Sequence, residues 1–425
     1  MRVANLRSLL KNRNYAIYTV GNGVSLTGTW IYGIAFAWLV WQLTESTLWL
    51  GIVAAAGIVP TILAGLIGGV LADRLDRLKL VIWTQILAFL ATGLLFILYQ
   101  FDAVGIYWLI LFKIIISTTV AISQPARMAL IPNLVGEKMV GPAISFGSMV
   151  FNTARFIGPA IAGFIIARGG VGIAFLINAL TYIVMAGAIL MVKIPDRLVR
   201  SPTSGSKPNK MSRDMQDSLT YIRNHSGVLT LFVLMIFAVL GLRPISNFLP
   251  AISTGIFDRG VDGLAILTSS AAGGSIIGGI WSAGRDIDGL TKSALVTVSI
   301  YAILIIIFLM MPWFWMGCIV FAATGFFTTI FAISAQTLVQ ASVADDMRGR
   351  VMSLWFILTR GGPDAGALFI GIVGEAAGLP TAFTIGAIIC VAIAGWAWLR
   401  RKDLANELED RTQHIDSRVT NRPSI

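Results

Sequence analysis

Charged residues are scarce in this chain of 425 residues. Only 12% of its positions are Asp, Glu, Lys or Arg, about half the fraction usual in soluble proteins, whereas 56% are hydrophobic. A single soluble core cannot hide so many apolar side chains. Runs of about 20 apolar residues, each long enough to cross a bilayer core of about 30 Å, recur along the whole chain. The composition therefore predicts an all-α integral membrane protein with many spans.

Cysteine and histidine are rarer still. The two cysteines, Cys318 and Cys390, fall inside apolar runs, so the sequence predicts neither a disulfide framework nor a metal site. His225 and His414 lie in polar segments, which excludes a histidine-based centre within the membrane. The phosphate-binding pattern GxxxxGK[ST] does not occur, which excludes ATP hydrolysis by such a loop. We expect no enzyme activity, no catalytic residues, no metal and no cofactor.

The apolar runs form two sets of six predicted spans. They fall at roughly 15–42, 47–71, 79–99, 105–126, 141–167 and 171–192, and then at roughly 229–252, 263–284, 293–311, 313–338, 350–374 and 379–399. The polar stretch between the sets contains a segment, 211–224, with the spacing of an amphipathic surface helix. We predict an N-terminal half over 1–193, a cytoplasmic linker over 194–227, a C-terminal half over 228–403 and a cytoplasmic tail over 404–425.

Basic residues predict the orientation of these spans. If the N-terminus is cytoplasmic, 26 of the 32 Lys and Arg residues lie on the cytoplasmic side, and only Arg168 and Arg259 lie in outer loops. The net charge of +11 is therefore a topology signal and requires no nucleic-acid partner. The basic N-terminus leads into an apolar run that is too long for a signal peptide, so we expect an uncleaved first span.

The stretch GGVLADRLDRLKL, from Gly68 to Leu80, connects the second and third predicted spans. With its glycine, its Asp-Arg pair and its further Arg and Lys, it resembles the loop signature of the major facilitator superfamily. Four other stretches resemble the bacterial exporter branch that contains the enterobactin exporter and macrolide-efflux proteins. These are NRNYAIYTVGNGVSLTGTWIYGIAFAWLVWQLTEST, QPARMALIPNLV, RFIGPAIAG and DDMRGRVMSL.

This resemblance implies the major facilitator fold, in which two pseudo-symmetric six-helix halves alternate in access around a site near the bilayer midplane. It also implies location in the bacterial inner membrane, with substrate, proton and lipid bilayer as partners. We expect a proton-coupled exporter of a small anionic or amphipathic organic compound, such as a siderophore. A multidrug or macrolide efflux transporter is the alternative, and a non-transporting membrane sensor is a distant one. Import remains open because gradients set the direction of a reversible cycle.

The same loop predicts a conformational latch between the halves. Asp73 ends its own helix, where the macrodipole disfavours a carboxylate, so it should seek the N-terminus of the eleventh span. The alternative is that the cluster only anchors the loop inside. Asp76 stands where the superfamily usually has glycine, and we expect it to adopt a positive φ there. The predicted latch residues are Gly69, Asp73, Arg74, Arg77, Arg348 and Arg350.

Few charges fall within the predicted spans, and each should face a cavity or a partner because a charge at a helix centre costs at least ~2.5–3.5 kcal/mol. Arg360 and Asp364, spaced i,i+4, can pair on one helix face and are candidates for proton coupling. The other cations predict a cavity that favours an anionic substrate. The predicted substrate-binding residues are Lys113, Arg155, Arg243, Asn22 and Trp30.

Four of these residues also have a structural interpretation. Arg155 and Arg360 precede Gly-Pro pairs and can bind carbonyl groups that a kink sets free. Arg243 precedes Pro244 and can reach the outer surface. Trp30 can pack against lipid or lie in an interfacial belt.

Overall fold

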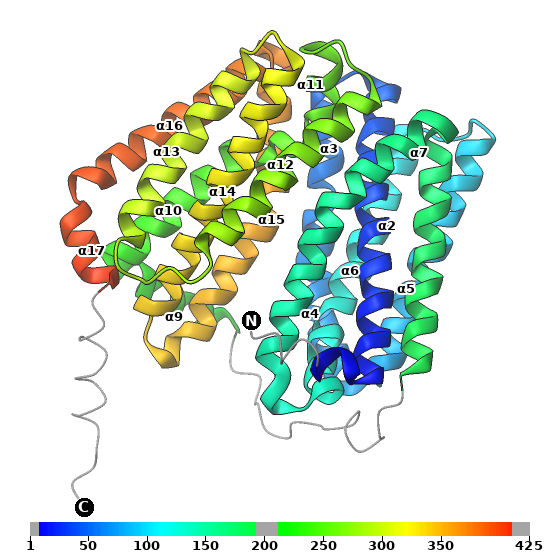
Figure 1. Cartoon of the computed structure of the whole chain (residues 1–425), viewed down its shortest axis with the longest axis horizontal. Coiled ribbons are helices and arrows are strands. Elements are labelled where there is room, and N and C mark those ends of the chain that lie inside the picture. The colour runs from blue at the N-terminus through cyan, green and yellow to red at the C-terminus, as the bar shows by residue number, and fades with distance from the viewer. Residues whose placement is uncertain (1–7, 193–210, 410–425) are drawn as a thin grey trace, which may run out of the picture. The chain divides into compact units, whose positions relative to one another are not determined.

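The computed structural model describes residues 8–192 and 211–409, and these form helices joined by short turns (Figure 1). Eleven helical segments among them are long and apolar enough to cross a membrane. Twelve spans were predicted, and the difference arises because segments 141–167 and 171–192 share one helical element. By its contacts the chain divides into two compact units: Met1–Gly205 with Asn247–Ala272, and Ser206–Ser246 with Gly273–Ile425.

The first unit is built mainly from the N-terminal helices. Its elements are α2 (Arg13–Thr44), α3 (Thr47–Ala55), α4 (Ile58–Arg74), α5 (Arg77–Gln100), α6 (Ile106–Val135), the short 3-10 helix η1 (Glu137–Met139) and α7 (Val140–Met191). The element α7 has 52 residues, but Gly170 breaks it with non-helical backbone at φ 75° and ψ 174°. A turn at Ala56 and Gly57 separates α3 from α4 within the second predicted span. Glycine tolerates the positive φ at Gly170, whereas Gly57 has φ −80° and ψ −13°, in the right-handed region.

Small residues bring α2 and α7 together along much of their length (Figure 1). A Cβ added at Gly21 would meet the side chain of Ala188, and one added at Gly28 would meet Thr181. Close approach of this kind is how membrane helices gain packing energy without a hydrophobic driving force. At the end where α2 begins, the Asn12 amide donates to the Leu134 carbonyl at 2.7 Å, which joins α2 to the last turn of α6.

The second unit is built from the C-terminal helices, with α9 at its surface. Its main elements are α9 (Met211–Asn224), α10 (Ser226–Gly241), α13 (Leu290–Leu309), α14 (Phe314–Ser342), α15 (Asp345–Ala377), α16 (Leu379–Leu399) and α17 (Arg401–Glu409). The predicted amphipathic segment 211–224 is α9. The boundary between the units crosses α12 (Val261–Ser282), whereas α11 (Leu249–Gly255) groups with the first unit.

The segment predicted as one span over 229–252 is not one continuous helix. It consists of α10, the 3-10 helix η2 (Arg243–Asn247) and α11. Pro244 lacks an N–H group and its ring clashes with the preceding turn, so the α-helix ends before it.

The short helix α17 closes one end of the second unit. The Glu407 carboxylate accepts hydrogen bonds from Ser226 Oγ at 2.5 Å and Gly227 N at 3.0 Å, at the start of α10. The Glu409 carboxylate accepts from Gly289 N at 2.8 Å and Thr291 N at 2.7 Å, at the start of α13. Helix N-termini have free N–H groups and attract negative charge. One helix therefore caps two others.

We expect Glu409→Ala to destabilise the protein by about 1–2 kcal/mol, because it leaves two backbone N–H groups of α13 without their acceptor. Thermal unfolding of the purified full chain measures the effect. Asn406→Ala, an exposed position on the same helix, is the matched control and should leave the unfolding temperature unchanged. Equal unfolding temperatures for the two variants would show that the cap contributes nothing.

Candidate functional site

A half-buried arginine lies inside the first unit. Arg127 on α6 donates from Nη1 to the Asn22 side-chain oxygen on α2 at 3.0 Å. The hydroxyl groups of Tyr18 on α2 and Tyr182 on α7 are close enough to its guanidinium to interact electrostatically. Three helices that are far apart in sequence thus converge on one cation. We call Asn22, Arg127, Tyr18 and Tyr182 the arginine cluster.

The arginine cluster lies deep within its helices. Asn22 comes nine residues after the start of α2, whereas Arg127 and Tyr182 come eight and nine residues before the ends of α6 and α7. At 1.5 Å per residue, these positions are about 12–13 Å from the ends of the helices. Tyr15, Leu134 and Ile189 belong to an apolar core between the cluster and that end of the unit. The cation is therefore not at the membrane surface.

Buried polar atoms without a hydrogen-bond partner are frequent in the first unit. Within the described residues they include Arg127 Nε, Tyr32 OH, Gln85 Oε1 and Thr92 Oγ1. An unsatisfied buried polar group costs about 1–3 kcal/mol, and native proteins satisfy such groups with water or ligand. The interior of this unit is therefore chemically suited to hold water or the polar part of a substrate.

The structure brings together Trp30 and Arg155, two of the predicted substrate-binding residues. The Arg155 guanidinium lies over the Trp30 ring, 5.7 Å from its centroid, as a cation–π pair. Phe151 packs edge-on against the same ring at 5.9 Å, and the Trp30 Cβ lies where a side chain at Gly158 would be. Trp30 thus packs against one face of α7.

Lys113 lies near the start of α6, whereas Arg127 lies nearer its end. Its side chain passes beside Gly57, since a Cβ added at Gly57 would be 2.8 Å from Lys113 Cε. Gly57 lies in the turn between α3 and α4. The Lys113 side chain therefore lies beside the point where the second predicted span is interrupted. Lys113 and Arg127 are fourteen residues apart on α6, about 21 Å along the helix, and so form separate sites.

In the second unit, Arg243 and Arg360 are brought together. Arg243 lies in η2 and is near enough to interact electrostatically with Arg360 and with the Tyr301 hydroxyl. Arg360 and Asp364 lie on α15, which continues as a helix through Pro363, so their predicted i,i+4 spacing is retained. Two like charges within electrostatic range of each other attract an anion more strongly than either does alone.

Two of the predicted latch residues cap the ends of helices. Arg77 donates to the carbonyl groups of Ala72 and Ala129, both at 3.3 Å, and so joins the last turns of α4 to α6. Arg348 donates to the carbonyls of Gln340 at 2.8 Å and Val343 at 3.1 Å, at the end of α14. The carbonyls of Ala72, Gln340 and Val343 are free acceptors of a helix C-terminus, whereas Ala129 lies within α6.

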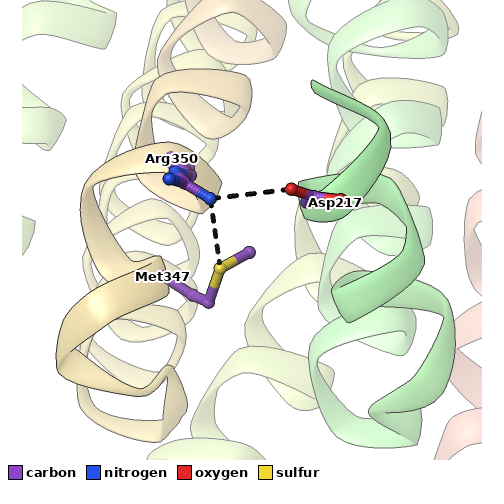
Figure 2. A network of polar contacts seen from close by, with 3 residues as sticks. All are labelled: Asp217, Met347 and Arg350. Carbon is purple, nitrogen blue, oxygen red and sulfur yellow. Dashed lines mark hydrogen bonds and ion pairs between the residues drawn. The ribbon is translucent and has the colours of Figure 1, made fainter. Parts of the chain in front are cut away.

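Arg350 contacts the surface helix α9. Its Nη1 atom lies 3.8 Å from Asp217 Oδ2 and 3.9 Å from Met347 Sδ (Figure 2). With side chains 40% and 54% exposed, this ion pair contributes about 0–1 kcal/mol. The side chain of Asp73, the predicted centre of the latch, lies outside the described residues, while Gly69 and Arg74 lie in the last two turns of α4. The latch therefore stays a prediction.

The expectation of a positive φ at Asp76 is wrong. Asp76 has φ −61° and ψ 117°, and its side chain accepts hydrogen bonds from Leu78 N at 2.9 Å and Lys79 N at 3.2 Å. It is the N-cap of α5. An aspartate satisfies free N–H groups at a helix start, which glycine cannot do, so the loop uses a cap here.

The sequence prediction missed Arg127 because it ended the fourth span at residue 126. The helix α6 continues through Pro125 and Pro132 to Val135. The available signal was the buried apolar face that continues beyond Pro125 and includes Leu130 and Leu134.

These features define the class of the protein. A helical chain with many membrane-length apolar segments carries cations within those segments, and no group of metal-binding side chains is found in the residues that the structure describes. It is a membrane transporter. A family described as "Transmembrane secretion effector" matches residues 7–420, and the chain belongs to this family of the major facilitator superfamily.

Curated relatives are similar over nearly their whole length. The chain is 26% identical to the staphyloferrin A transporter of Staphylococcus aureus (strain NCTC 8325 / PS 47), covering 91% of this chain and 96% of the relative. It is 24% identical to macrolide efflux protein A of Streptococcus pyogenes, covering 90% and 95%.

Solved structures share the fold. A bacterial homologue of the human lysosomal transporter Spinster, in an inward-facing and unoccupied conformation, matches with a TM-score of 0.70 at 15% identity, covering 96% of this chain and 99% of that one. The nucleoside transporter NupG matches with a TM-score of 0.67 at 14% identity, covering 92% and 99%. These similarities confirm the predicted major facilitator fold.

Proposed function

We propose that this protein is a proton-coupled secondary transporter that exports a small anionic organic compound of the siderophore class. The observation that carries the proposal is the charge of the N-terminal helices of the first unit: the membrane-length segments between Arg13 and Met191 contain Lys113, Arg127 and Arg155 away from their ends, and no Asp or Glu. A positive charge within a membrane span is costly unless negative charge lies near it, so this excess of cations favours a substrate that supplies negative charge. The relative named as a staphyloferrin A transporter agrees with this assignment.

Coupling is assigned to α15. We propose that protonation of Asp364 weakens its attraction to Arg360, and that this change links the proton gradient to alternating access. The predominance of Lys and Arg in alternate loops supports a bacterial plasma-membrane protein with both termini in the cytoplasm.

A second candidate is export of an amphipathic drug of the macrolide type. The aromatic cluster of Trp30 and Phe151 favours it, because aromatic rings offer apolar contact area together with a cation at Arg155. In this case the cations would be mainly structural.

Uptake into inside-out membrane vesicles distinguishes the two candidates. We expect an imposed pH gradient to drive uptake of a carboxylate siderophore, and Arg155→Gln to reduce that uptake about tenfold through loss of a charged contact. Arg168→Gln is the matched control, because this exposed arginine also lies over an aromatic ring, that of Phe164. A macrolide transported equally by all three proteins, with no siderophore uptake, would overturn the anionic assignment.

The same vesicles test the coupling. With Asp364→Asn, siderophore uptake should no longer respond to the imposed pH gradient, while exchange across vesicles without a gradient persists. An unchanged response to the gradient, abolished in both proteins by an uncoupler, would remove Asp364 from the coupling step.

A further inference from the structure

A groove on the second unit remains outside the proposed transport function. It has a cavity volume of about 740 Å³ and lies between α10 and α16, with the start of α17 at one end. Its walls are mostly apolar and include Leu229, Val233, Ile393 and Trp396. Because α10 and α16 belong to membrane-length segments, these walls are suited to contact with hydrocarbon chains.

The polarity of the groove changes along its length. The polar lining residues Ser226, Arg400 and Asp403 lie where α10 begins and where α16 gives way to α17. Val233 and Ile393 lie seven residues further into their helices, about 10 Å at the helical rise. The groove therefore matches a molecule with a polar head and an apolar chain, oriented as a membrane lipid is.

The polar end carries one charge of each sign. Arg400 is exposed, and its guanidinium lies over the Trp396 ring, 4.7 Å from the centroid. A cation–π contact uses the charge of the guanidinium and does not use its N–H groups as hydrogen-bond donors. Arginine binds phosphate through paired hydrogen bonds. Asp403, also exposed and lining the groove, supplies a carboxylate that binds an ammonium group.

Helix α17 holds these groups in place. Glu407 connects α17 to α10 through its hydrogen bond to Gly227 N. The buried side chain of Leu404, also on α17, lines the groove. The positions of Arg400 and Asp403 relative to α10 are therefore set before a ligand arrives, which reduces the entropy lost on binding.

We propose that this groove binds a phospholipid with a primary-amine headgroup, phosphatidylethanolamine. Its phosphate contacts Arg400, its ammonium contacts Asp403, and the start of one acyl chain lies along Leu229, Val233 and Ile393. Phosphatidylglycerol has no ammonium and brings a net negative charge to Asp403. Phosphatidylcholine has a quaternary amine that cannot donate a hydrogen bond to a carboxylate.

Native mass spectrometry of the full chain, titrated with each of the three lipids in detergent, tests the proposal. We expect the apparent Kd for phosphatidylethanolamine to be about tenfold lower than for the other two lipids, the effect of one charged hydrogen bond. Asp403→Asn should abolish this preference while retaining phospholipid binding. Arg400→Gln should weaken binding of all three lipids, and Lys402→Gln, an exposed neighbouring cation that does not line the groove, is the control.

A further variant separates the groove from its charges. Ala392→Trp fills the groove from an exposed position on α16 and should abolish lipid binding although Arg400 and Asp403 are unchanged. Unfolding temperatures of all variants establish that they are folded. Equal Kd values for the three lipids in the unmodified protein, or a preference that survives both Asp403→Asn and Ala392→Trp, would overturn the proposal.

Discussion

Replacing Arg127 by glutamine is expected to reduce transport about 100-fold without lowering the unfolding temperature. The glutamine side chain ends where the Arg127 Nε atom lies, short of Nη1, so the charge and the direct hydrogen bond to Asn22 are both lost. Taking a charge out of water is costly. Replacing a buried ion by an uncharged side chain therefore often leaves the stability of the fold unchanged or raises it. An arginine kept at this depth therefore indicates a functional requirement. Loss of a charge-assisted contact between Arg127 and the substrate costs about 1.5–3 kcal/mol of binding free energy.

Transport into vesicles and thermal unfolding are both measured on Arg127→Gln. Arg127→Lys retains the charge and should recover part of the activity. Arg13→Gln, an exposed position at the start of α2, is the control and should behave as the unmodified protein does. A lower unfolding temperature, with normal transport per folded molecule, would instead show that Arg127 only holds α2, α6 and α7 together.

Gly274→Ala is expected to prevent accumulation of folded protein. Gly274 on α12 faces the backbone of α14, where an added Cβ would overlap the Ala322 carbonyl and lie 3.1 Å from Phe326 N. Gly278, four residues on, meets the Phe326 carbonyl in the same way, with 2.6 Å between its added Cβ and that oxygen. A methyl group at Gly274 has only backbone in front of it, so the two helices must separate, at a cost of about 3 kcal/mol or more.

The same helix provides the control. Gly279 follows Gly278 directly, but a Cβ there has no neighbour within 4 Å. Alanine favours a helix over glycine by about 1 kcal/mol, so Gly279→Ala should be neutral or stabilising. Size-exclusion profiles and unfolding temperatures of the two variants measure the contrast. Similar yields and stabilities would show that α12 and α14 do not pack through Gly274.

Hydropathy placed the membrane-length segments well, because a span is defined by the length and apolarity of one stretch of chain. It did not place the interruptions at Gly57 and at Arg243–Pro244, where apolar character continues although the α-helix ends. At Pro125 the prediction ended the fourth span too early, because the helix α6 continues beyond it. Proline usually ends a helix, but within a membrane bundle neighbouring groups satisfy the carbonyl it frees, and α6 continues.

The candidate site was predictable in its residue types and less so in its contacts. Scarcity of charge identified Lys113 and Arg155, and the polarity of Asn22 suggested that it faces the interior. The partner of Asn22 is 105 residues away, and only tertiary packing brings the two together. Asp76 shows a limit of family resemblance, because a substituted residue at a familiar position can stabilise the loop by a different mechanism.

The caps made by α17 determine how one end of the second unit can move. Because only Arg400 separates α17 from α16, Glu407 and Glu409 connect α16, α10 and α13. Relative sliding of these three helices at this end would break four hydrogen bonds to the two carboxylates. We infer that they travel as one rigid block during the cycle. A spectroscopic label on the exposed side of α17 would then report the displacement of the whole block from a single position.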